Sequence, residues 1–268
     1  MRISSIGAGN MATAFIKSVI SSGRVKAHDI TVFDINTAKY DEFRKLSVNC
    51  ADSVSEACDA SEVILLAVKP QDYEKVLNDI KPFCLQKKKA FISIAAAIST
   101  DFICKALGES FPVVRVMPNT PLLIGYGATA ISRNALVDDK MYTKICGLFA
   151  ASGSGSVVSL DEALMNKVIS VNSSSPAYVY LFAKAMIDNA VEQGFDKELA
   201  TDLVYKTMKG AAEMLIKSDL DADGLIRMVA SPNGTTEAAL RSFENDNFKS
   251  IVSNAMNACT ARAEEMAR

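Results

Sequence analysis

Short runs of apolar residues alternate with amphipathic stretches along the first 160 residues of the chain. Within the segment 63–68 (Val-Ile-Leu-Leu-Ala-Val) every position is apolar, which is typical of a strand covered on both faces. We predict strands at residues 2–6, 29–34, 62–68, 90–95, 113–117, 127–132 and 156–159, and helices at 11–22, 36–46, 71–80, 100–107 and 138–151. This alternation predicts an α/β fold with a doubly wound parallel sheet.

The pattern changes after Asp161, where no further strand is predicted and helical periodicity covers residues 161–171, 176–193, 197–217 and 235 to the C-terminus. We therefore divide the chain into an α/β domain at residues 1–160 and an all-helical domain at residues 161–268. In the segment 177–187 apolar residues occupy nearly every face of the helix, so one neighbouring layer cannot cover them. A helical domain alone can hide such a helix, but sharing it with a second subunit is the more natural arrangement, and we predict a homodimer.

Composition and charge argue against several classes of function. Of 268 residues, 49% are apolar and 22% charged, and 29 basic against 31 acidic residues give a formal net charge of −2. This balance lacks the electrostatic footprint of a nucleic-acid binder, so we expect no nucleic-acid partner. The six cysteines lack the spacing of a zinc or redox motif, and a single histidine argues against a metal site. Without a membrane-spanning run or a secretory leader, we expect a cytoplasmic protein whose chemistry comes from a cofactor.

Residues 7–12 (Gly-Ala-Gly-Asn-Met-Ala) fit the pattern GxGxxA between the first predicted strand and its helix. Gly7 permits a tight turn, Gly9 lets the backbone approach a pyrophosphate, and Ala12 keeps the helix close to the sheet. The helix N-terminus adds N–H donors and a positive partial charge. The alternative is a plain glycine turn in an α/β protein that binds no nucleotide. We predict a Rossmann dinucleotide site that includes Gly7, Ala8, Gly9, Asn10 and Met11.

Asp34 closes the second predicted strand, where a carboxylate can accept hydrogen bonds from the adenosine ribose and repels a 2′-phosphate. Taken by itself, this residue favours NADH. Asn36, Thr37 and Lys39 follow directly and could hold the phosphate of NADPH instead. A carboxylate here can also cap the next helix, so the choice between the two cofactors stays open.

Other candidate residues follow strand ends at the carboxyl edge of the sheet, where ligands of such folds bind. Ala67-Val68-Lys69-Pro70 ends one predicted strand and Ala95-Ala96 ends the next, and their small side chains leave room for a flat ring. Packing alone would explain the alanines, and Lys69 could be a solvated lysine. Asn119 follows a third strand between two prolines that stiffen the backbone, although such prolines also occur in plain turns.

Two segments of the helical half combine hydroxyl groups with a helix start. Ser174 belongs to a serine-rich loop before Pro176, which fits the first position of a helix. The second segment leads the last predicted helix and contains Ser231, Gly234, Thr235 and Thr236. Both segments offer N–H and O–H donors without a cation, which suits a small carboxylate, and structural capping explains them equally well.

Together these motifs resemble one family, the pyrroline-5-carboxylate reductases, over essentially the whole chain. The resemblance is carried by segments 7–12, 67–70, 117–121, 174–178 and 231–236, of which the last, continued by Ala239-Leu240 and Phe243-Glu244, is the most specific. It implies a Rossmann domain followed by an all-α dimerisation domain, often assembled as a ring of dimers. It also implies that NADPH or NADH binds at 7–11, 67–70 and Ala95-Ala96.

The same resemblance implies that pyrroline-5-carboxylate is held by Ser231, Gly234, Thr235 and Thr236, in a cleft formed with the partner subunit. We add Asn119 and Ser174 as expected substrate contacts. A hydride passes to the C=N carbon and gives L-proline, the last step of proline biosynthesis. Thr236 can reach the imine nitrogen and is our catalytic candidate. Because a protonated imine is already electrophilic, orientation supplies most of the acceleration and no histidine is needed.

Four places depart from the family pattern, and two other functions remain as alternatives. One of the four is Met228, where the family often has an acidic residue. Asn172-Ser173, Ala97 and Asn233 stand where the family commonly has glycine, which bears on substrate fit and turnover. A β-hydroxyacid dehydrogenase would share the two-domain layout and would use Lys167, although the expected glycine spacing is absent. The departures also motivate a non-catalytic paralogue that only senses a dinucleotide.

Overall fold

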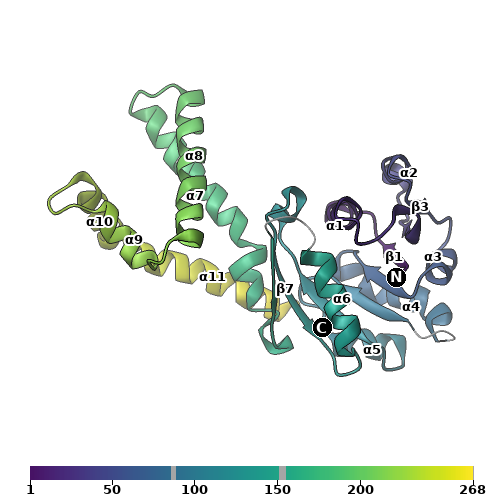
Figure 1. Cartoon of the computed structure of the whole chain (residues 1–268). Helices are drawn as coiled ribbons and strands as arrows, with labels where there is room; N and C mark the ends of the chain where they lie inside the picture. The colour runs from purple at the N-terminus through teal and green to yellow at the C-terminus, as the bar shows by residue number, and fades with distance from the viewer. Residues whose placement is uncertain (86–88, 151–154, 268) are drawn as a thin grey trace. The chain divides into compact units, whose positions relative to one another are not determined.

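The structure is a computed structural model that describes residues 1–85, 89–150 and 155–267. The chain separates into two compact units. Unit 1 comprises Met1–Ser174 together with Cys259–Arg268, and unit 2 comprises Ser175–Ala258. Over the described residues, unit 1 holds the sheet and unit 2 is helical (Figure 1). The predicted domain boundary after residue 160 lies inside unit 1.

Unit 1 is built on an eight-stranded sheet with the order β3-β2-β1-β4-β5-β6-β7-β8. Its strands are β1 (Ile3–Ile6), β2 (Ile30–Phe33), β3 (Asn49–Cys50), β4 (Val63–Leu66), β5 (Ala90–Ser93), β6 (Val113–Met117), β7 (Ala128–Arg133) and β8 (Ser156–Ser159). All neighbouring strands pair in parallel except β6 and β7, which are antiparallel. The predicted α/β fold with a doubly wound parallel sheet is confirmed, with the antiparallel pair β6 and β7 as an exception that was not predicted.

Helices cover both faces of this sheet. They are α1 (Asn10–Ser21), α2 (Tyr40–Lys45), α3 (Val54–Ala60), α4 (Tyr73–Cys84), α5 (Thr100–Leu107) and α6 (Asp139–Ala150). Leu65 of β4 packs into a core that includes residues of α1, α2 and α6, whereas its neighbours Ile64 and Leu66 pack into a second core with residues of α3, α4 and α5. Because successive side chains of a strand point to opposite faces, a strand between two cores must be apolar throughout, as the sequence pattern indicated.

Unit 1 differs locally from the prediction. Neither β3 nor α3 was predicted. The helix predicted at 138–151 corresponds to α6, and residue 151, its predicted last residue, lies outside the described residues. A single helix at 161–171 is wrong, because the chain forms a 3₁₀ turn at Glu162–Leu164 and a π-helical turn at Ile169–Ser173. Glu162 instead accepts hydrogen bonds from the Thr100 backbone N–H at 2.6 Å and the Thr100 hydroxyl at 2.5 Å. This segment is therefore shaped by contacts to α5 and not by its own helical periodicity.

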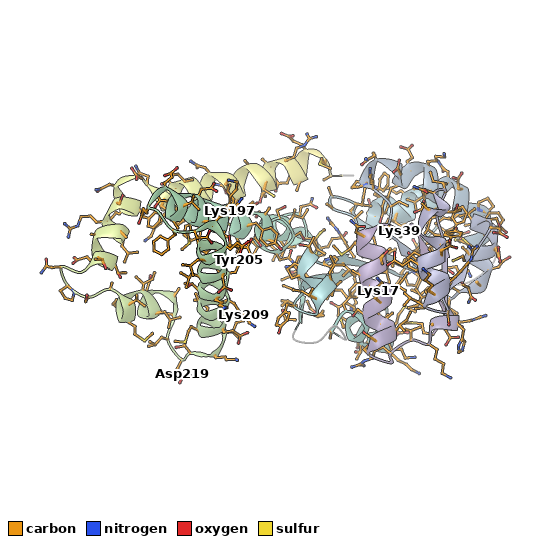
Figure 2. All side chains as sticks on the ribbon, turned by 90° about the horizontal axis from the view of Figure 1, so that it is seen from above. Lys17, Lys39, Lys197, Tyr205, Lys209 and Asp219 are labelled. Carbon is orange, nitrogen blue, oxygen red and sulfur yellow. The ribbon has the colours of Figure 1, made fainter. Side chains whose placement is uncertain are left out.

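Unit 2 contains α7 (Ser175–Glu192), α8 (Lys197–Lys217), α9 (Ala222–Val229), α10 (Thr235–Asn245) and the first part of α11 (Phe248–Glu265), whose end belongs to unit 1. Figure 2 shows Lys197, Tyr205 and Lys209 along α8 and Asp219 in the turn after it. The short helix α9 was not predicted. One helix from residue 235 to the C-terminus is wrong, because the chain breaks at Asn247, which has a φ of 55°.

Unit 2 has a thin core of its own. Among its described residues, only four hydrophobic side chains are buried, Ala183 and Ile187 on α7 and Ala200 and Val204 on α8. Large apolar side chains on the same helices are exposed, including Leu181 at 69% and Ile216 at 76%. Unit 2 therefore presents much more apolar surface than its own packing covers.

Candidate active site

The candidate cofactor residues of unit 1 gather at one edge of the sheet. The turn 7–11 follows β1, Asp34 follows β2, the segment 67–70 follows β4, and Ala95-Ala96 follows β5. These four strands are mutually parallel, so their carboxyl ends lie at the same edge. Asn119 follows β6, which is parallel to β5, at that edge as well.

The first glycine turn is held by close backbone contacts. Gly7 has a φ of 109°, and its N–H donates to the Phe33 carbonyl at 2.8 Å. A Cβ atom on Gly7 would lie 2.5 Å from the Ala67 carbonyl oxygen, so no other residue fits without a shift of the backbone. Gly7 therefore brings the turn after β1 into contact with the segment after β4.

Gly9 serves a different purpose, because a Cβ atom there would meet nothing within 4 Å. Gly9 is the N-cap of α1, and no side chain caps that helix start. The N–H groups of the first turn have no intrahelical acceptors, and together with the helix dipole they suit an anion. Open space and unused donors at the same turn fit the pyrophosphate of a dinucleotide.

Asp34 joins this turn to the loop after β2. One carboxylate oxygen accepts the Ala8 N–H at 2.7 Å, and the other accepts the Asn36 N–H at 2.8 Å. Tyr40 lies behind it, and its hydroxyl accepts the Asp34 N–H at 3.0 Å. Burial raises the pKa of the Tyr40 phenol. The Asp34 carboxylate thus has a structural task at the position predicted to face the adenosine ribose.

A cation lies beside the same turn. The Lys39 ammonium donates to the Asn10 side-chain oxygen at 2.8 Å and so reaches the first residue of α1. Asn36 caps the short 3₁₀ turn that carries Lys39, because its side-chain oxygen accepts the Ala38 N–H at 3.0 Å. This geometry holds a positive charge near Asp34, where the sequence left the choice of cofactor open.

The side-chain amides of Asn119 and Asn172 bind backbone groups around the ends of β6 and β7. Asn119, which is 8% exposed, donates to the Asn172 carbonyl at 3.2 Å and accepts the Ala128 N–H at 3.0 Å. Asn172 in turn donates to the Met117 carbonyl at 3.0 Å. Nearby, the Ser174 hydroxyl accepts from the Cys259 thiol at 3.4 Å. Asn119 and Ser174 therefore already have protein partners, and their role as substrate contacts stays a prediction.

The predicted substrate turn in unit 2 has a defined shape. The Gly234 N–H donates to the Ser231 carbonyl at 3.0 Å, and Asn233 between them has a φ of 58°. A Cβ atom on Gly234 would lie 2.4 Å from the Ser231 hydroxyl oxygen. Asparagine tolerates this left-handed conformation better than most residues, which accounts for Asn233 at a position where glycine is common in the family.

The helix start after this turn keeps most of its donors. Gly234 is the N-cap of α10, and its position supplies no side-chain hydrogen bond to the first N–H groups of the helix. Glu237 reaches back to the Asn233 N–H at 2.5 Å. The N–H and O–H groups of Thr235 and Thr236 form part of the same helix start. Thr236 also lines an otherwise apolar pocket of about 420 Å³ between α8, α9 and α10.

Comparison with known proteins covers both halves of the chain. Residues 162–266 match the family model described as pyrroline-5-carboxylate reductase dimerisation, and residues 2–97 match the one described as NADP oxidoreductase, coenzyme F420-dependent. The pyrroline-5-carboxylate reductase of Escherichia coli is 34% identical over 100% of this chain and 98% of its own length. That of Pseudomonas aeruginosa is 36% identical, over 99% and 97%. The chain belongs to the pyrroline-5-carboxylate reductase family.

A solved structure supports the same family. The pyrroline carboxylate reductase of Plasmodium falciparum, determined with NADP bound, superimposes with a TM-score of 0.91 at 29% identity and covers 100% of this chain and 98% of its own. Full-length similarity to pyrroline-5-carboxylate reductases favours that family over a β-hydroxyacid dehydrogenase. Lys167, which that alternative needs, is exposed just before the π-helical turn.

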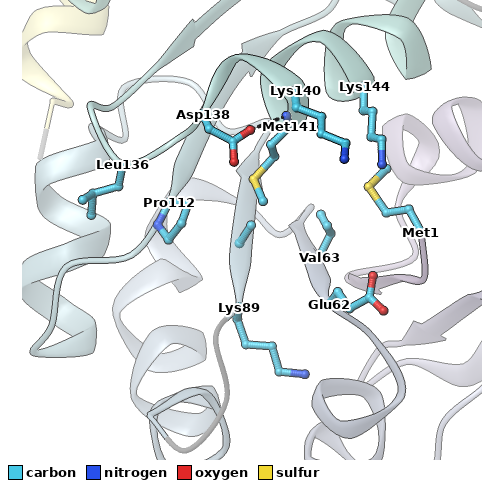
Figure 3. Close-up of a pocket in the computed structure, with 11 residues that line it drawn as sticks. Met1, Glu62, Val63, Lys89, Pro112, Leu136, Asp138, Lys140, Met141 and Lys144 are labelled. Atoms are coloured by element: carbon cyan, nitrogen blue, oxygen red, sulfur yellow. Dashed lines mark hydrogen bonds between the residues drawn. The ribbon is translucent and has the colours of Figure 1, made fainter.

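A pocket of unit 1 lies away from the predicted site residues. It measures about 560 Å³ and is lined at the amino ends of β4, β5 and β6 by residues such as Val63, Ala90 and Pro112, with Lys140 and Lys144 from α6 (Figure 3). The predicted cofactor residues follow the carboxyl ends of the same strands. No predicted site residue lines this pocket.

Among the described residues, no group of three or more histidine, cysteine or acidic side chains is placed to hold a metal ion. In the same residues, no helix combines the length and the hydropathy that a membrane span requires.

Proposed function

We propose that this chain reduces 1-pyrroline-5-carboxylate to L-proline with NADPH or NADH, the last step of proline biosynthesis. The observation that carries the proposal is that a chain of this family has two helix N-termini suited to binding an anion, one in each unit. The start of α1 in unit 1 suits a pyrophosphate, and the start of α10 in unit 2 suits a small carboxylate.

In unit 1, the residues would bind the cofactor in three parts. The turn 7–11 takes the pyrophosphate, because Gly9 leaves space there and the first N–H groups of α1 face it. Asp34 and Lys39 lie at the ribose end. The segments 67–70 and Ala95-Ala96 flank the nicotinamide. When bound, the reduced nicotinamide supplies a hydride to the C=N carbon of the substrate.

In unit 2, the turn 231–236 would hold the substrate. The hydroxyl of Ser231 and the N–H groups of Gly234 and Thr235 suit the carboxylate. The Thr236 hydroxyl is the hydrogen-bonding partner for the ring nitrogen, which carries the proton while the neighbouring carbon gains the hydride. Since the protonated imine is already electrophilic, these residues act by orientation and not by supplying a strong acid.

We further propose that the protein is a homodimer formed through unit 2, in which the partner subunit completes the substrate cleft. Exposed large apolar side chains on α7, α8, α9 and α11 support this, since a second subunit would remove them from water. A ring of dimers and a cytoplasmic location, the latter suggested by cysteine usage, belong to the same proposal. Absence of a nucleic-acid partner stays a prediction from the balanced charge.

Steady-state kinetics with 1-pyrroline-5-carboxylate, using NADPH and NADH side by side, tests the reaction. Turnover with this imine and none with short 3-oxo acids is the expected result. Activity with the 3-oxo acids alone would instead favour a β-hydroxyacid dehydrogenase. If the cofactor binds, as followed by its fluorescence, yet no substrate turns over, the chain is a dinucleotide sensor.

The variant Thr236→Ala tests the role of the turn. It should lower kcat while the Kd of NADPH stays unchanged, because its hydroxyl is assigned to the substrate. An equal loss of cofactor binding in this variant would show that the turn 231–236 has been assigned to the wrong ligand.

A further inference from the structure

Tyr73 is a buried phenol close to both segments assigned to the nicotinamide. It is the first residue of α4 and stands three positions after Pro70. Its side chain is fully buried among residues of the second core, which includes Ile64, Leu66 and Phe91. Burying a hydroxyl in an apolar core costs free energy unless the group is hydrogen-bonded, so its partners matter.

The Tyr73 hydroxyl has partners on two strands. Its oxygen lies 2.9 Å from the carbonyl oxygen of Leu66, the last residue of β4, and 2.9 Å from the hydroxyl oxygen of Ser93, the last residue of β5. A phenol has one hydrogen, and a carbonyl cannot donate. Tyr73 must therefore donate to Leu66, and Ser93 donates to Tyr73.

Leu66 and Ser93 stand just before the segments that are assigned to the nicotinamide. Leu66 is followed directly by the segment 67–70, and Ser93 stands two residues before Ala95. Leu66 also accepts the Ile94 N–H at 3.3 Å, which is the last backbone contact between the two strand ends. One hydroxyl thus adds a second tie between the two segments at the point where they leave the sheet.

The phenol stays protonated in this setting. Burial raises the pKa of Tyr73, while hydrogen bonds from Ser93 and the Ala95 backbone and the positive charge of buried Arg115 lower it by less. The raised pKa favours the neutral phenol, which is the form that can donate to Leu66.

We propose that Tyr73 is a positioning residue for hydride transfer, because its hydroxyl sets the separation of the segments 67–70 and 95–96, between which the proposed function places the nicotinamide. This inference rests on the proposed function. Hydride transfer is sensitive to the distance and angle between the two reacting carbons, and a small misplacement lowers the rate more than it lowers binding. Tyr73 itself touches neither ligand.

The test is Tyr73→Phe, which removes one oxygen and keeps the ring in the core. We expect kcat to fall about 10-fold while the Kd of NADPH changes less than about 3-fold. With NADPH deuterated at the transferred position, the isotope effect on kcat should rise, because hydride transfer becomes rate-limiting. Ser93→Ala should give the same pattern, and the double variant should be no slower than Tyr73→Phe alone, because both changes break one tie.

Tyr142→Phe is the matched control. The Tyr142 hydroxyl also joins two strands, donating to the Ile131 carbonyl of β7 at 3.3 Å and accepting from the Ser159 hydroxyl of β8 at 2.8 Å, away from the segments 67–70 and 95–96. This variant should keep the kcat and the isotope effect of the unchanged chain. Urea unfolding of all variants separates lost stability from lost positioning.

The outcomes distinguish this inference from the proposed function. If the unchanged chain reduces pyrroline-5-carboxylate and Tyr73→Phe keeps its kcat and isotope effect while unfolding at lower urea, the role is merely structural and the inference is overturned alone. If the unchanged chain shows no turnover at all, the proposed function falls and takes the inference with it.

Discussion

At the scale of single residues, backbone conformation decides how two departures from the family pattern are tolerated. Ala97 is 1% exposed and has a φ of 65°, and Asn233 has a φ of 58°. For Asn233 the cost is small, whereas alanine in the left-handed region costs roughly 1–2 kcal/mol. Ala97 is therefore a strained position next to the segment assigned to the nicotinamide.

Replacing Ala97 by glycine should stabilise the protein. Glycine relieves the strain at positive φ but adds about 0.4–1 kcal/mol of unfolded-state entropy, so the free energy of unfolding should rise by about 0.5–1 kcal/mol. Urea denaturation measures the change. The neighbour Ala96, which has no positive φ, is the matched control. Ala96→Gly should destabilise, and a loss of stability in both variants would show that Ala97 is not strained.

Lys39 should decide the choice between NADPH and NADH. Its ammonium lies beside the start of α1, and a charge-assisted contact to a 2′-phosphate is worth about 1.5–3 kcal/mol. Lys39→Gln should therefore raise the KM for NADPH about 10-fold or more, with the KM for NADH within about 2-fold. Steady-state kinetics with both cofactors measures this.

Lys17→Gln is the control for that change. Lys17 also lies on the outside of unit 1 (Figure 2), but its ammonium pairs with Glu42 at 2.6 Å. The variant should leave both KM values unchanged. A parallel rise for NADPH and NADH in Lys39→Gln would contradict a phosphate contact and leave Asp34 as the residue that selects the cofactor.

Sequence patterns identify site residues whose task is set by their own backbone. The roles of Gly7 and Gly9 could be predicted from the GxGxxA motif, because a tight turn and room for the pyrophosphate depend on the backbone at those positions alone. The contacts of Tyr73 to Ser93, Lys39 to Asn10 and Asn172 to Met117 carry no such signal, since these partners are at least 20 residues apart and only the fold brings them together.

At the scale of elements, the two glycines in the turn from β1 into α1 have different structural roles. A Cβ on Gly7 would collide with the Ala67 carbonyl, whereas a Cβ on Gly9 would meet open space. Gly7→Ala should thus lower the free energy of unfolding by about 2 kcal/mol or more, because positive φ and a backbone clash add. Urea denaturation measures that loss.

Gly9→Val should behave in the opposite way. The free energy of unfolding should change by less than about 1 kcal/mol, while NADPH binding, followed by fluorescence titration, is lost because the side chain fills the space assigned to the pyrophosphate. Wild-type affinity for NADPH in this variant would place the pyrophosphate elsewhere.

The sequence predicted elements best where a single pattern governs them. Strand β4, which is buried on both faces, lies within its predicted range, since a continuous apolar run needs two covering layers. Prediction failed where tertiary contacts override periodicity, as in the π-helical turn at 169–173, and where an element is very short, as in β3. Between Lys217 and Thr235, helix α9 starts at an Asp221 cap that the apolar pattern alone did not reveal.

At the scale of the whole molecule, unit 2 cannot account for its apolar surface by itself. Leu181 on α7, Ile216 on α8, Val229 on α9 and Ile251 on α11 are all more than half exposed, while only four hydrophobic residues of its described part are buried. Helices that are apolar on several faces need a second covering layer, and the family's dimerisation domain coincides with this region. A second copy of the chain is the covering layer that the proposed function requires.

Leu181→Glu should therefore break the dimer. Sedimentation velocity should find the unchanged chain dimeric at micromolar concentration, because burial of this surface must offset the thin core of unit 2. A buried unpaired carboxylate costs several kcal/mol, so the variant should dissociate at least about 100-fold more readily. Leu136→Glu, half-exposed in unit 1, introduces the same charge and should leave the dimer intact. A folded monomer of the unchanged chain at that concentration would mean that the exposed helices of unit 2 are stable in water alone, and would overturn the proposed dimer.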